Sequence, residues 1–229
     1  GFAIRIELRS NDLDGTLQPE LRVLNSLLEL SLNGNSLQGN LFPELAELSS
    51  LQVLDLEENL FVGNPWEILS SLKSLAILRI SFNGFSGDLP SGLSVLTNLV
   101  DLWIAGNAFV GELPTTLGSL SILQNLLVYS NDLTGTLPTE LGNCDLNIFL
   151  AYENSFNGSI PDSLYSNTDL AALRLENNQL TGTVDSKIGS LLDLEDLRIS
   201  NNHFSGPLPH SISSLTKLRN FLLRNNDFT

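Results

Sequence analysis

The chain has 229 residues, of which 42% are hydrophobic, and its formal net charge is −15 at pH 7. Such an acidic chain argues against a nucleic-acid partner, because neutralising phosphates requires a basic face, and against electrostatic docking on an anionic membrane. The apolar content is sufficient for a hydrophobic core, and no linker or low-complexity segment divides the sequence. Its single cysteine cannot form a disulfide within the chain.

Asparagine recurs through the chain at a nearly constant interval. The ten recurring residues are Asn11, Asn35, Asn59, Asn83, Asn107, Asn131, Asn154, Asn178, Asn202 and Asn226. Eight of the nine intervals are 24 residues long, and the interval from Asn131 to Asn154 is 23. A glycine lies four residues after each of the first nine asparagines, with a Leu or Phe between them. This pattern is the signature of leucine-rich repeats, so we predict a solenoid whose function lies on its surfaces.

The residues before each asparagine predict a short β-strand, as the unit at residues 96–119 illustrates. Apolar residues alternate there, so Leu102 and Ile104 are expected to point inward from one strand of a parallel sheet on the concave side. Asn107 follows this strand, and its amide can satisfy buried backbone groups of the turn and connect adjacent units. The ten asparagines therefore predict a hydrogen-bonded ladder along the solenoid.

The residues after each asparagine predict the return of the chain to the convex side. Gly111 and its equivalents permit a positive φ angle or a close approach of the backbone. Leu117 and Leu120 have helical spacing, which predicts a short 3₁₀ or α-helical turn. Because one unit cannot bury its apolar face alone, the stacking of units creates the core.

The complete unit resembles the plant-type leucine-rich repeat. A clear example runs from Asn131 to Gly142, with the sequence Asn-Asp-Leu-Thr-Gly-Thr-Leu-Pro-Thr-Glu-Leu-Gly. This type is found in ectodomains of plant receptor kinases and receptor-like proteins, in polygalacturonase-inhibiting proteins, and in repeat proteins of algae and diatoms. The resemblance covers essentially the whole chain and implies an α/β repeat solenoid. It would be a right-handed superhelix of about nine to ten 24-residue repeats, with a concave parallel β-sheet and a second sheet formed by the Leu-x-Gly-x-Ile-Pro segments.

Several units depart from this pattern. Pro19 and Pro43 come one place later than the usual proline, Pro65 occupies the place of an inward aliphatic residue, and Asp185 replaces the proline. The early departures weaken the expectation of a second sheet near the N-terminus. Cys144 occupies a leucine position just before the short unit, where we expect a local kink, and its thiol is predicted to be a small core group.

The resemblance implies one leucine-rich repeat domain over residues 1–229. Receptor-type ectodomains of this family carry cysteine-paired caps at both ends, whereas this chain begins close to a first repeat and ends mid-repeat at Thr229. We therefore expect a segment of a longer protein that lacks both caps. The sequence contains no signal peptide and no apolar run long enough to insert this segment into a membrane.

No catalytic grouping is recognisable in the sequence. His203 and His210 are the only histidines, and neither belongs to a nucleophile–base arrangement. Acidic pairs such as Glu57 and Glu58 lack calcium-loop spacing. We therefore predict no enzyme activity, no metal site and no cofactor in this segment, although a kinase domain would be consistent with a longer chain. Asn157 begins the only glycosylation sequon and is a glycosylation candidate if the chain is secreted.

Two outward-facing positions on each strand define the predicted concave surface. The first ladder consists of Glu7, Ser31, Asp55, Arg79, Trp103, Leu127, Leu150, Arg174, Arg198 and Leu222. The second ladder consists of Arg9, Asn33, Glu57, Ser81, Ala105, Tyr129, Tyr152, Glu176, Ser200 and Arg224. Aromatic and arginine side chains gather on neighbouring strands, and these residue types are enriched at binding hot spots. The predicted ligand-binding residues are Arg79, Phe82, Trp103, Leu127, Tyr129, Leu150, Tyr152, Arg174, Arg198 and Arg224.

We expect an extended peptide or a partner's surface to lie across units four to nine. Its apolar anchor would contact Trp103, Tyr129 and Tyr152. An acidic group, such as a C-terminal carboxylate, would face Arg174 and Arg198. The alternative interpretation is that these side chains are neutral surface variation or cross-strand pairs that stabilise the sheet.

The leading functional prediction is a non-catalytic recognition module, namely the extracellular ligand-binding region of a receptor-like membrane protein that takes part in signal transduction. The alternatives are a secreted inhibitor of a cell-wall hydrolase, similar to the polygalacturonase inhibitors, and a structural or adhesive extracellular protein. The predicted partner is a peptide or protein ligand, with a co-receptor as a further candidate and a monomer otherwise. Fold resemblance carries much of this ranking, and a fold does not by itself determine function.

Overall fold

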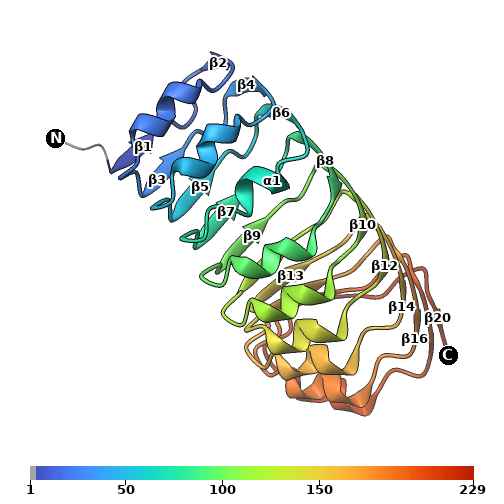
Figure 1. Cartoon of the computed structure of the whole chain (residues 1–229). Helices are drawn as coiled ribbons and strands as arrows, with labels where there is room; N and C mark the ends of the chain where they lie inside the picture. The colour runs from blue at the N-terminus through green and yellow to red at the C-terminus, as the bar shows by residue number, and fades with distance from the viewer. Residues whose placement is uncertain (1–3) are drawn as a thin grey trace.

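The computed structural model describes residues 4–229, so the first three residues of the predicted first repeat lie outside the described part. Two parallel sheets of ten strands each run along the described residues, and each strand pairs with its equivalents in the adjacent units, on one side only at the two ends. Figure 1 shows the result as an elongated, curved stack of coils with the short helical turns along one side. The predicted leucine-rich repeat solenoid is therefore confirmed.

Each unit contributes one strand to each sheet. The first, concave sheet consists of β1 (Arg5–Glu7), β3 (Glu29–Ser31), β5 (Val53–Asp55), β7 (Ile77–Arg79), β9 (Asp101–Trp103), β11 (Asn125–Leu127), β13 (Ile148–Leu150), β15 (Ala172–Arg174), β17 (Asp196–Arg198) and β19 (Asn220–Leu222). The second sheet consists of β2 (Asp14–Gly15), β4 (Ser36–Gly39), β6 (Leu60–Gly63), β8 (Gly84–Asp88), β10 (Ala108–Glu112), β12 (Asp132–Thr136), β14 (Ser155–Gly158), β16 (Gln179–Gly182), β18 (His203–Gly206) and β20 (Asp227–Phe228).

Short helical turns return the chain to the next unit, as the leucine spacing predicts. The 3₁₀ turns are η1 (Pro19–Val23), η2 (Pro43–Glu47), η3 (Ser91–Val95), η4 (Thr115–Ser119), η5 (Thr139–Asn143), η6 (Asp162–Ser166), η7 (Ser186–Ser190) and η8 (His210–Ser214). The third unit forms an α-helical turn instead, α1 (Trp66–Leu69). Its Trp66 is 2% exposed and packs on Phe109 with ring centroids 5.2 Å apart.

The two sheets differ in register. In the concave sheet, equivalent residues of successive units are directly paired, as Leu102 is with Leu126. In the second sheet the pairing is offset by two residues, so that Phe109 lies opposite Gly87 rather than opposite its equivalent Phe85. The second sheet also continues through the irregular first units, contrary to the expectation drawn from their displaced prolines. Those prolines follow the paired residues, so they remove no hydrogen bond from the sheet.

The core is a continuous column of leucine and phenylalanine side chains. Leu102 and Ile104 are fully buried, as their alternation predicts. Phenylalanines that follow the recurring asparagines add a second buried column, in which the rings of Phe61 and Phe85 are stacked with centroids 6.0 Å apart. Burying each such side chain contributes about 1.5–3 kcal/mol relative to exposure, and this contribution is realised only when neighbouring units stack.

The recurring asparagines form a hydrogen-bonded ladder. The Oδ1 atom of Asn107 accepts a hydrogen bond of 3.0 Å from the backbone N–H of Phe85 in the preceding unit. Its Nδ2 atom donates to the carbonyl of Ile80 in that unit at 3.0 Å and to the carbonyl of Ile104 in its own unit at 3.1 Å. The same pattern recurs at Asn59, Asn83, Asn131, Asn154, Asn178, Asn202 and Asn226. Each amide therefore connects two units.

The short unit is accommodated at the site where the sequence predicts a kink. Cys144 ends η5 with an extended backbone (φ −81°, ψ 173°), whereas its equivalent Leu120 has φ −85° and ψ 66°. In a regular unit the N–H of Leu123 donates to the carbonyl of Leu120. The short unit has one residue fewer at this turn, and the equivalent N–H, that of Leu146, donates to the Oδ1 atom of Asn167 at 2.8 Å. The concave sheet continues across this unit with β11 and β13 paired at equivalent positions.

Candidate recognition surface on the concave sheet

An aromatic row crosses the middle of the concave face. It consists of Phe82, Tyr129 and Tyr152. Phe82 meets Tyr129 edge to face with ring centroids 6.2 Å apart, and Tyr129 is stacked on Tyr152 at 4.3 Å. The guanidinium of Arg174 lies over the Tyr152 ring, 4.2 Å from its centroid. Such contacts fix the rings in place, because aromatic and cation–π pairs each contribute about 0.5–1.5 kcal/mol.

Phe82 joins this row because of a glycine in the next unit. Its backbone is in the left-handed region, with φ of 55°, and its side chain is 46% exposed. A Cβ atom on Gly106 would lie 2.5 Å from the Cδ1 atom of Phe82, so only glycine leaves space for the ring at that position. Gly106 itself has φ of +60°. The phenyl ring can therefore extend across unit five to reach Tyr129 in unit six.

A second row follows the strand register beside the first. Trp103, Leu127, Leu150 and Arg174 are successive partners on β9, β11, β13 and β15. The side chains of Trp103, Leu127 and Leu150 are partly exposed. Arg79 places its guanidinium over the Trp103 ring, 3.9 Å from the centroid. The register continues from Arg174 to Arg198 on β17. The structure thus brings together nine of the ten predicted binding residues in two adjoining rows.

The concave arginines of units four, eight and nine already have carboxylate partners. Arg79 pairs with Asp101 at 2.7 Å, and Arg198 pairs with Asp196 at 2.8 Å. Arg174 directs both Nε and Nη2 to Oε1 of Glu176, at 3.0 and 2.6 Å.

These pairings change the electrostatics of the surface. Burial lowers the pKa of Arg174 and the hydrogen bond to Glu176 raises it, with a net increase above the ordinary value. Arg174 therefore stays charged, and its guanidinium is already paired with the carboxylate of Glu176 in the same protein.

Two of these carboxylates escaped the sequence prediction. Asp101 and Asp196 open β9 and β17 and define a third outward position that the two predicted ladders omit. The signal was present, because in a strand the residues on both sides of a buried one point outward. Asp101 also accepts a hydrogen bond of 2.7 Å from Nδ2 of Asn125 on the next strand.

Arg224 lies at the C-terminal end of the surface and is exposed, with no ion pair among residues 4–229. It lines a shallow polar hollow of about 190 Å³, and Arg198 contributes the other cationic side chain. Within this hollow, Oε2 of Glu176 and Oγ of Ser200 are buried and have no hydrogen-bond partner among the described residues. The hollow thus offers guanidinium donors beside a carboxylate oxygen and a hydroxyl.

The N-terminal end of the concave face is acidic. Asp55 is 4% exposed, and burial raises its pKa, opposed by a hydrogen bond from the backbone of Glu57. Burial likewise raises the pKa of Glu57. In the aromatic row, burial raises the pKa of Tyr152 to about 12, so its hydroxyl remains neutral at physiological pH. The surface therefore passes from an acidic end through a neutral aromatic centre to arginines.

The remaining residues considered in the sequence lie outside this surface. Cys144 is 8% exposed, its Sγ atom lies 3.5 Å from the carbonyl oxygen of Leu117, and burial raises its pKa to about 11. Burial therefore disfavours the thiolate, the reactive form of the thiol, and Cys144 packs as a core residue. His203 and His210 are exposed, and Asn157 is exposed on the second sheet. Residues 4–229 contain no cluster of three or more His, Cys, Asp or Glu side chains that could hold a metal ion. No helix in this part of the chain has the length and apolarity to cross a membrane.

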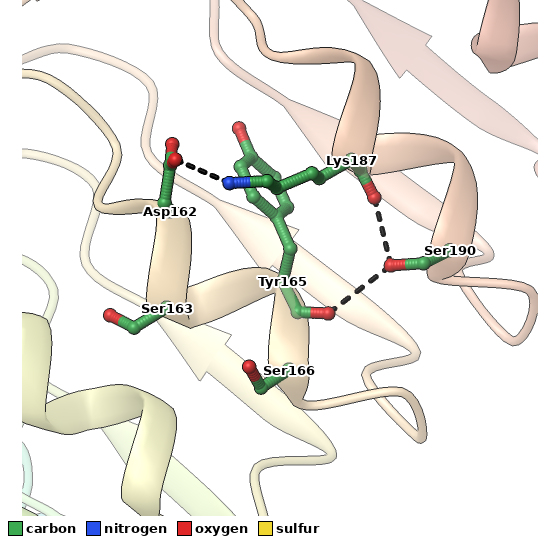
Figure 2. Close-up of a pocket in the computed structure, with 6 residues that line it drawn as sticks. All are labelled: Asp162, Ser163, Tyr165, Ser166, Lys187 and Ser190. Atoms are coloured by element: carbon green, nitrogen blue, oxygen red, sulfur yellow. Dashed lines mark hydrogen bonds and ion pairs between the residues drawn. The ribbon is translucent and has the colours of Figure 1, made fainter.

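A polar hollow of about 380 Å³ lies on the convex side, between η6 and η7. Figure 2 shows that Lys187 pairs with Asp162 across it, and that Oγ of Ser190 donates to the carbonyls of Tyr165 and Lys187. These groups hold neighbouring turns together. The hollow was not predicted from the sequence. Its only side-chain pair among the described residues is Lys187 with Asp162, the Ser163 and Ser190 hydroxyls donate to backbone carbonyls, and the Tyr165 hydroxyl is buried without a hydrogen-bond partner.

The fold, the asparagine ladder and the outward aromatic row define a repeat protein with a surface suited to binding. The leucine-rich repeat family model matches residues 74–96 and 193–215. No curated protein matches the chain. The chain is a leucine-rich repeat protein of the plant type.

Solved structures of plant receptors resemble the whole chain. The ectodomain of the Arabidopsis thaliana receptor kinase GASSHO1/SCHENGEN3, in complex with Casparian strip integrity factor 2, is 35% identical over 95% of this chain, with a TM-score of 0.91. The Arabidopsis receptor kinase HAESA, in complex with the peptide hormone IDA and the co-receptor SERK1, is 32% identical over 95%, with a TM-score of 0.91. A plant ice-binding protein is 26% identical over 99%, with a TM-score of 0.85. The chain spans 26% of the first protein, 37% of the second and 72% of the third.

Proposed function

We propose that this chain is the ligand-recognition region of a receptor-like protein and binds a peptide or protein on its concave face. The observation that carries the proposal is the row of contacting, partly exposed rings formed by Phe82, Tyr129 and Tyr152. Monomeric proteins seldom expose apolar groups together unless the patch is used for binding. The alternative role, stabilisation of the sheet, does not require Phe82 to be 46% exposed.

The arrangement of charges supports a polarised ligand. An apolar anchor would lie on Trp103, Tyr129 and Tyr152, as the sequence predicts. Arg174 directs both Nε and Nη2 to Glu176, whereas Arg198 uses only Nε for Asp196. We therefore assign the acidic group of the ligand to Arg224 and to the remaining donors of Arg198, which line one hollow. A guanidinium pair can bind a carboxylate through several charge-assisted hydrogen bonds.

Similar proteins support the same class of partner. GASSHO1/SCHENGEN3 and HAESA are receptor kinases solved with bound ligands, and HAESA was solved with a co-receptor as well. We therefore propose a peptide ligand, a co-receptor as an additional partner, and an extracellular or cell-surface location. Recognition is the role of the solenoid in this proposal, and signalling belongs to another part of such a receptor.

The test is a binding screen of the protein against secreted peptides and cell-wall hydrolases of its source. The variant Trp103→Ala/Tyr129→Ala is expected to lose at least tenfold in affinity, because hot-spot aromatics contribute about 2 kcal/mol or more. Ile122→Ala, on a side chain that is 45% exposed outside the concave sheet, is the matched control.

The outcomes separate the candidate functions. A peptide bound equally by the aromatic variant and by the native protein would refute the concave site. Binding to a hydrolase alone would favour the inhibitor function over the receptor function.

A further inference from the structure

Asn157 lies on a face of the molecule that differs in chemistry from the concave sheet. It is exposed at the third position of β14, in the second sheet, beside the fully buried Phe156. Apart from Asp132 and His203, at the first positions of β12 and β18, the residues that share this outward surface on β12, β14, β16, β18 and the segments that follow them are small or uncharged. We call them the neutral face, and they are Thr134, Thr136, Ser155, Asn157, Ser159, Gln179, Thr181, Thr183 and Ser205.

The neutral character of this face is unusual for the chain. The protein carries 26 acidic residues and a net charge of −15, yet the nine residues of the neutral face present hydroxyl and amide groups, and the acidic neighbours Asp132 and Glu112 lie at its β10–β12 side. The register places Thr136 and Gln179 directly beside Asn157, on β12 and β16 respectively. Hydroxyls and amides both donate and accept hydrogen bonds, so this surface can pair with the hydroxyl and acetamido groups of a sugar.

Asn157 also satisfies the covalent requirement for an attached sugar. Asn157-Gly158-Ser159 is an acceptor sequence for N-glycosylation, and Ser159 is exposed. The β14 backbone is paired on both sides, whereas the Asn157 side chain projects from the sheet. Other exposed asparagines on this side, such as Asn40 and Asn64, are followed by sequences without Ser or Thr at the second position.

We propose that Asn157 carries an N-linked oligosaccharide whose first sugars lie over the neutral face. The inference rests on the proposed extracellular location, because the modification requires entry into the secretory pathway. In the transfer, a bond forms between Nδ2 of Asn157 and C1 of the reducing-end N-acetylglucosamine of a lipid-diphosphate-linked oligosaccharide. The bond from C1 to the diphosphate oxygen breaks, the lipid diphosphate leaves with the electron pair, and the amide loses one proton.

The glycan determines which faces remain open to partners. Asn157 is on the second sheet, whereas the aromatic row belongs to the concave sheet and its adjoining turn. A sugar over the neutral face therefore covers β12, β14 and β16 and leaves Tyr129 and Tyr152 accessible. Partners would approach the concave side, and Asn157→Gln should leave peptide binding there unchanged.

The experiment directs the full chain into the secretory pathway of eukaryotic cells with a cleavable leader, and measures its intact mass before and after treatment with peptide-N-glycosidase F. The native protein and Ser159→Thr are expected to carry a glycan that the enzyme removes. Asn157→Gln and Ser159→Ala are expected to lack it. A native chain without the added mass would overturn the proposed site.

The position of the sugar is tested by cysteine accessibility. Gln179→Cys, beside Asn157, should be alkylated at least threefold more slowly before glycan removal than after it. Ile122→Cys lies between η4 and β11, outside the second sheet, and should react at one rate in both forms. The native thiol of Cys144 is buried. Equal rates for Gln179→Cys in the two forms would show that the sugars do not lie on the neutral face.

A final comparison tests the extracellular location and the recognition function separately from the modification site. Glycan on the secretory-directed chain but not on protein purified from its natural source would overturn the extracellular location and, with it, the natural modification. If the protein carried the glycan but bound no ligand on the concave face, the recognition function would be overturned and the modification site would be supported.

Discussion

The side chain of Asn167 compensates for the residue missing from the preceding unit, and its removal is expected to destabilise the fold. Asn167 is 4% exposed. Its Oδ1 atom accepts the hydrogen bond from the buried N–H of Leu146 at 2.8 Å, and its Nδ2 atom donates to the carbonyls of Leu141 and Leu164 at 3.2 and 3.1 Å. In regular units a backbone carbonyl accepts the equivalent N–H, as the carbonyl of Leu120 accepts that of Leu123.

The magnitude follows from the groups that Asn167→Ala would leave without partners. The N–H of Leu146 would lose its acceptor, at about 1–3 kcal/mol for a buried donor. The carbonyls of Leu141 and Leu164 would keep their backbone donors, Cys144 and Asn167, at 3.3 and 3.2 Å. The two lost donor bonds add about 0.5–1.5 kcal/mol each, so we expect a total loss of about 2–6 kcal/mol.

The assay is urea unfolding, with hydrogen exchange to locate the change. Asn143→Ala, an exposed position in the adjoining turn η5, is the matched control, with an expected change within about 0.5 kcal/mol. The Asn167→Ala midpoint should fall at unchanged slope, and the amide of Leu146 should exchange faster. If the two variants were equally stable, water would satisfy the Leu146 N–H and the compensation would be refuted.

Three further predictions concern the concave face. Gly106→Ala should lower the free energy of unfolding by about 1–2 kcal/mol, because a left-handed backbone is costly for alanine, and should displace Phe82 from Tyr129. Urea unfolding measures the first effect and near-ultraviolet circular dichroism the second. An unchanged aromatic spectrum would contradict the displacement of Phe82. Burial raises the pKa of Asp55 in the folded protein above its unfolded value of 3.8. Folding therefore favours the protonated carboxyl group, and the stability of the fold decreases as the pH rises from below 3.8 through the folded pKa. Asp55→Asn should therefore gain in melting temperature relative to the native protein between pH 3 and 7, whereas a constant difference would exclude this linkage. Arg224→Gln should weaken binding of a ligand with a free carboxylate by about tenfold and spare its amidated form, since a charge-assisted bond contributes about 1.5–3 kcal/mol; equal losses for both ligands would remove the carboxylate assignment.

The repeat frame was predictable from the sequence because each structural task recurs at one position. Leu102 and Ile104 point inward and Asn107 connects adjacent units since every unit poses the same steric and hydrogen-bonding problem. The interactions on the surface were less predictable, because they depend on what the neighbouring unit happens to carry. Phe82 reaches Tyr129 only because position 106 is glycine.

Other features required the three-dimensional backbone. Residue 167 is an asparagine where most other units have a leucine, which looks unfavourable for a core. The structure explains it, because the short unit lacks a backbone acceptor for the N–H of Leu146 and Asn167 supplies one. The two-residue offset of the second sheet is also invisible in the spacing of the asparagines. By contrast, the pairing of Arg79 with Asp101 followed from alternation and was simply missed.

The direct pairing of equivalent residues in the concave sheet fixes a scale for the partner. From β7 to β17 the surface includes six strands, and strands lie about 4.8 Å apart, so the track from Arg79 to Arg198 is roughly 24 Å long. An extended peptide advances about 3.3 Å per residue, so roughly seven residues would cover this track. Each repeat therefore meets about one and a half ligand residues, which makes the number of repeats a molecular ruler for ligand length.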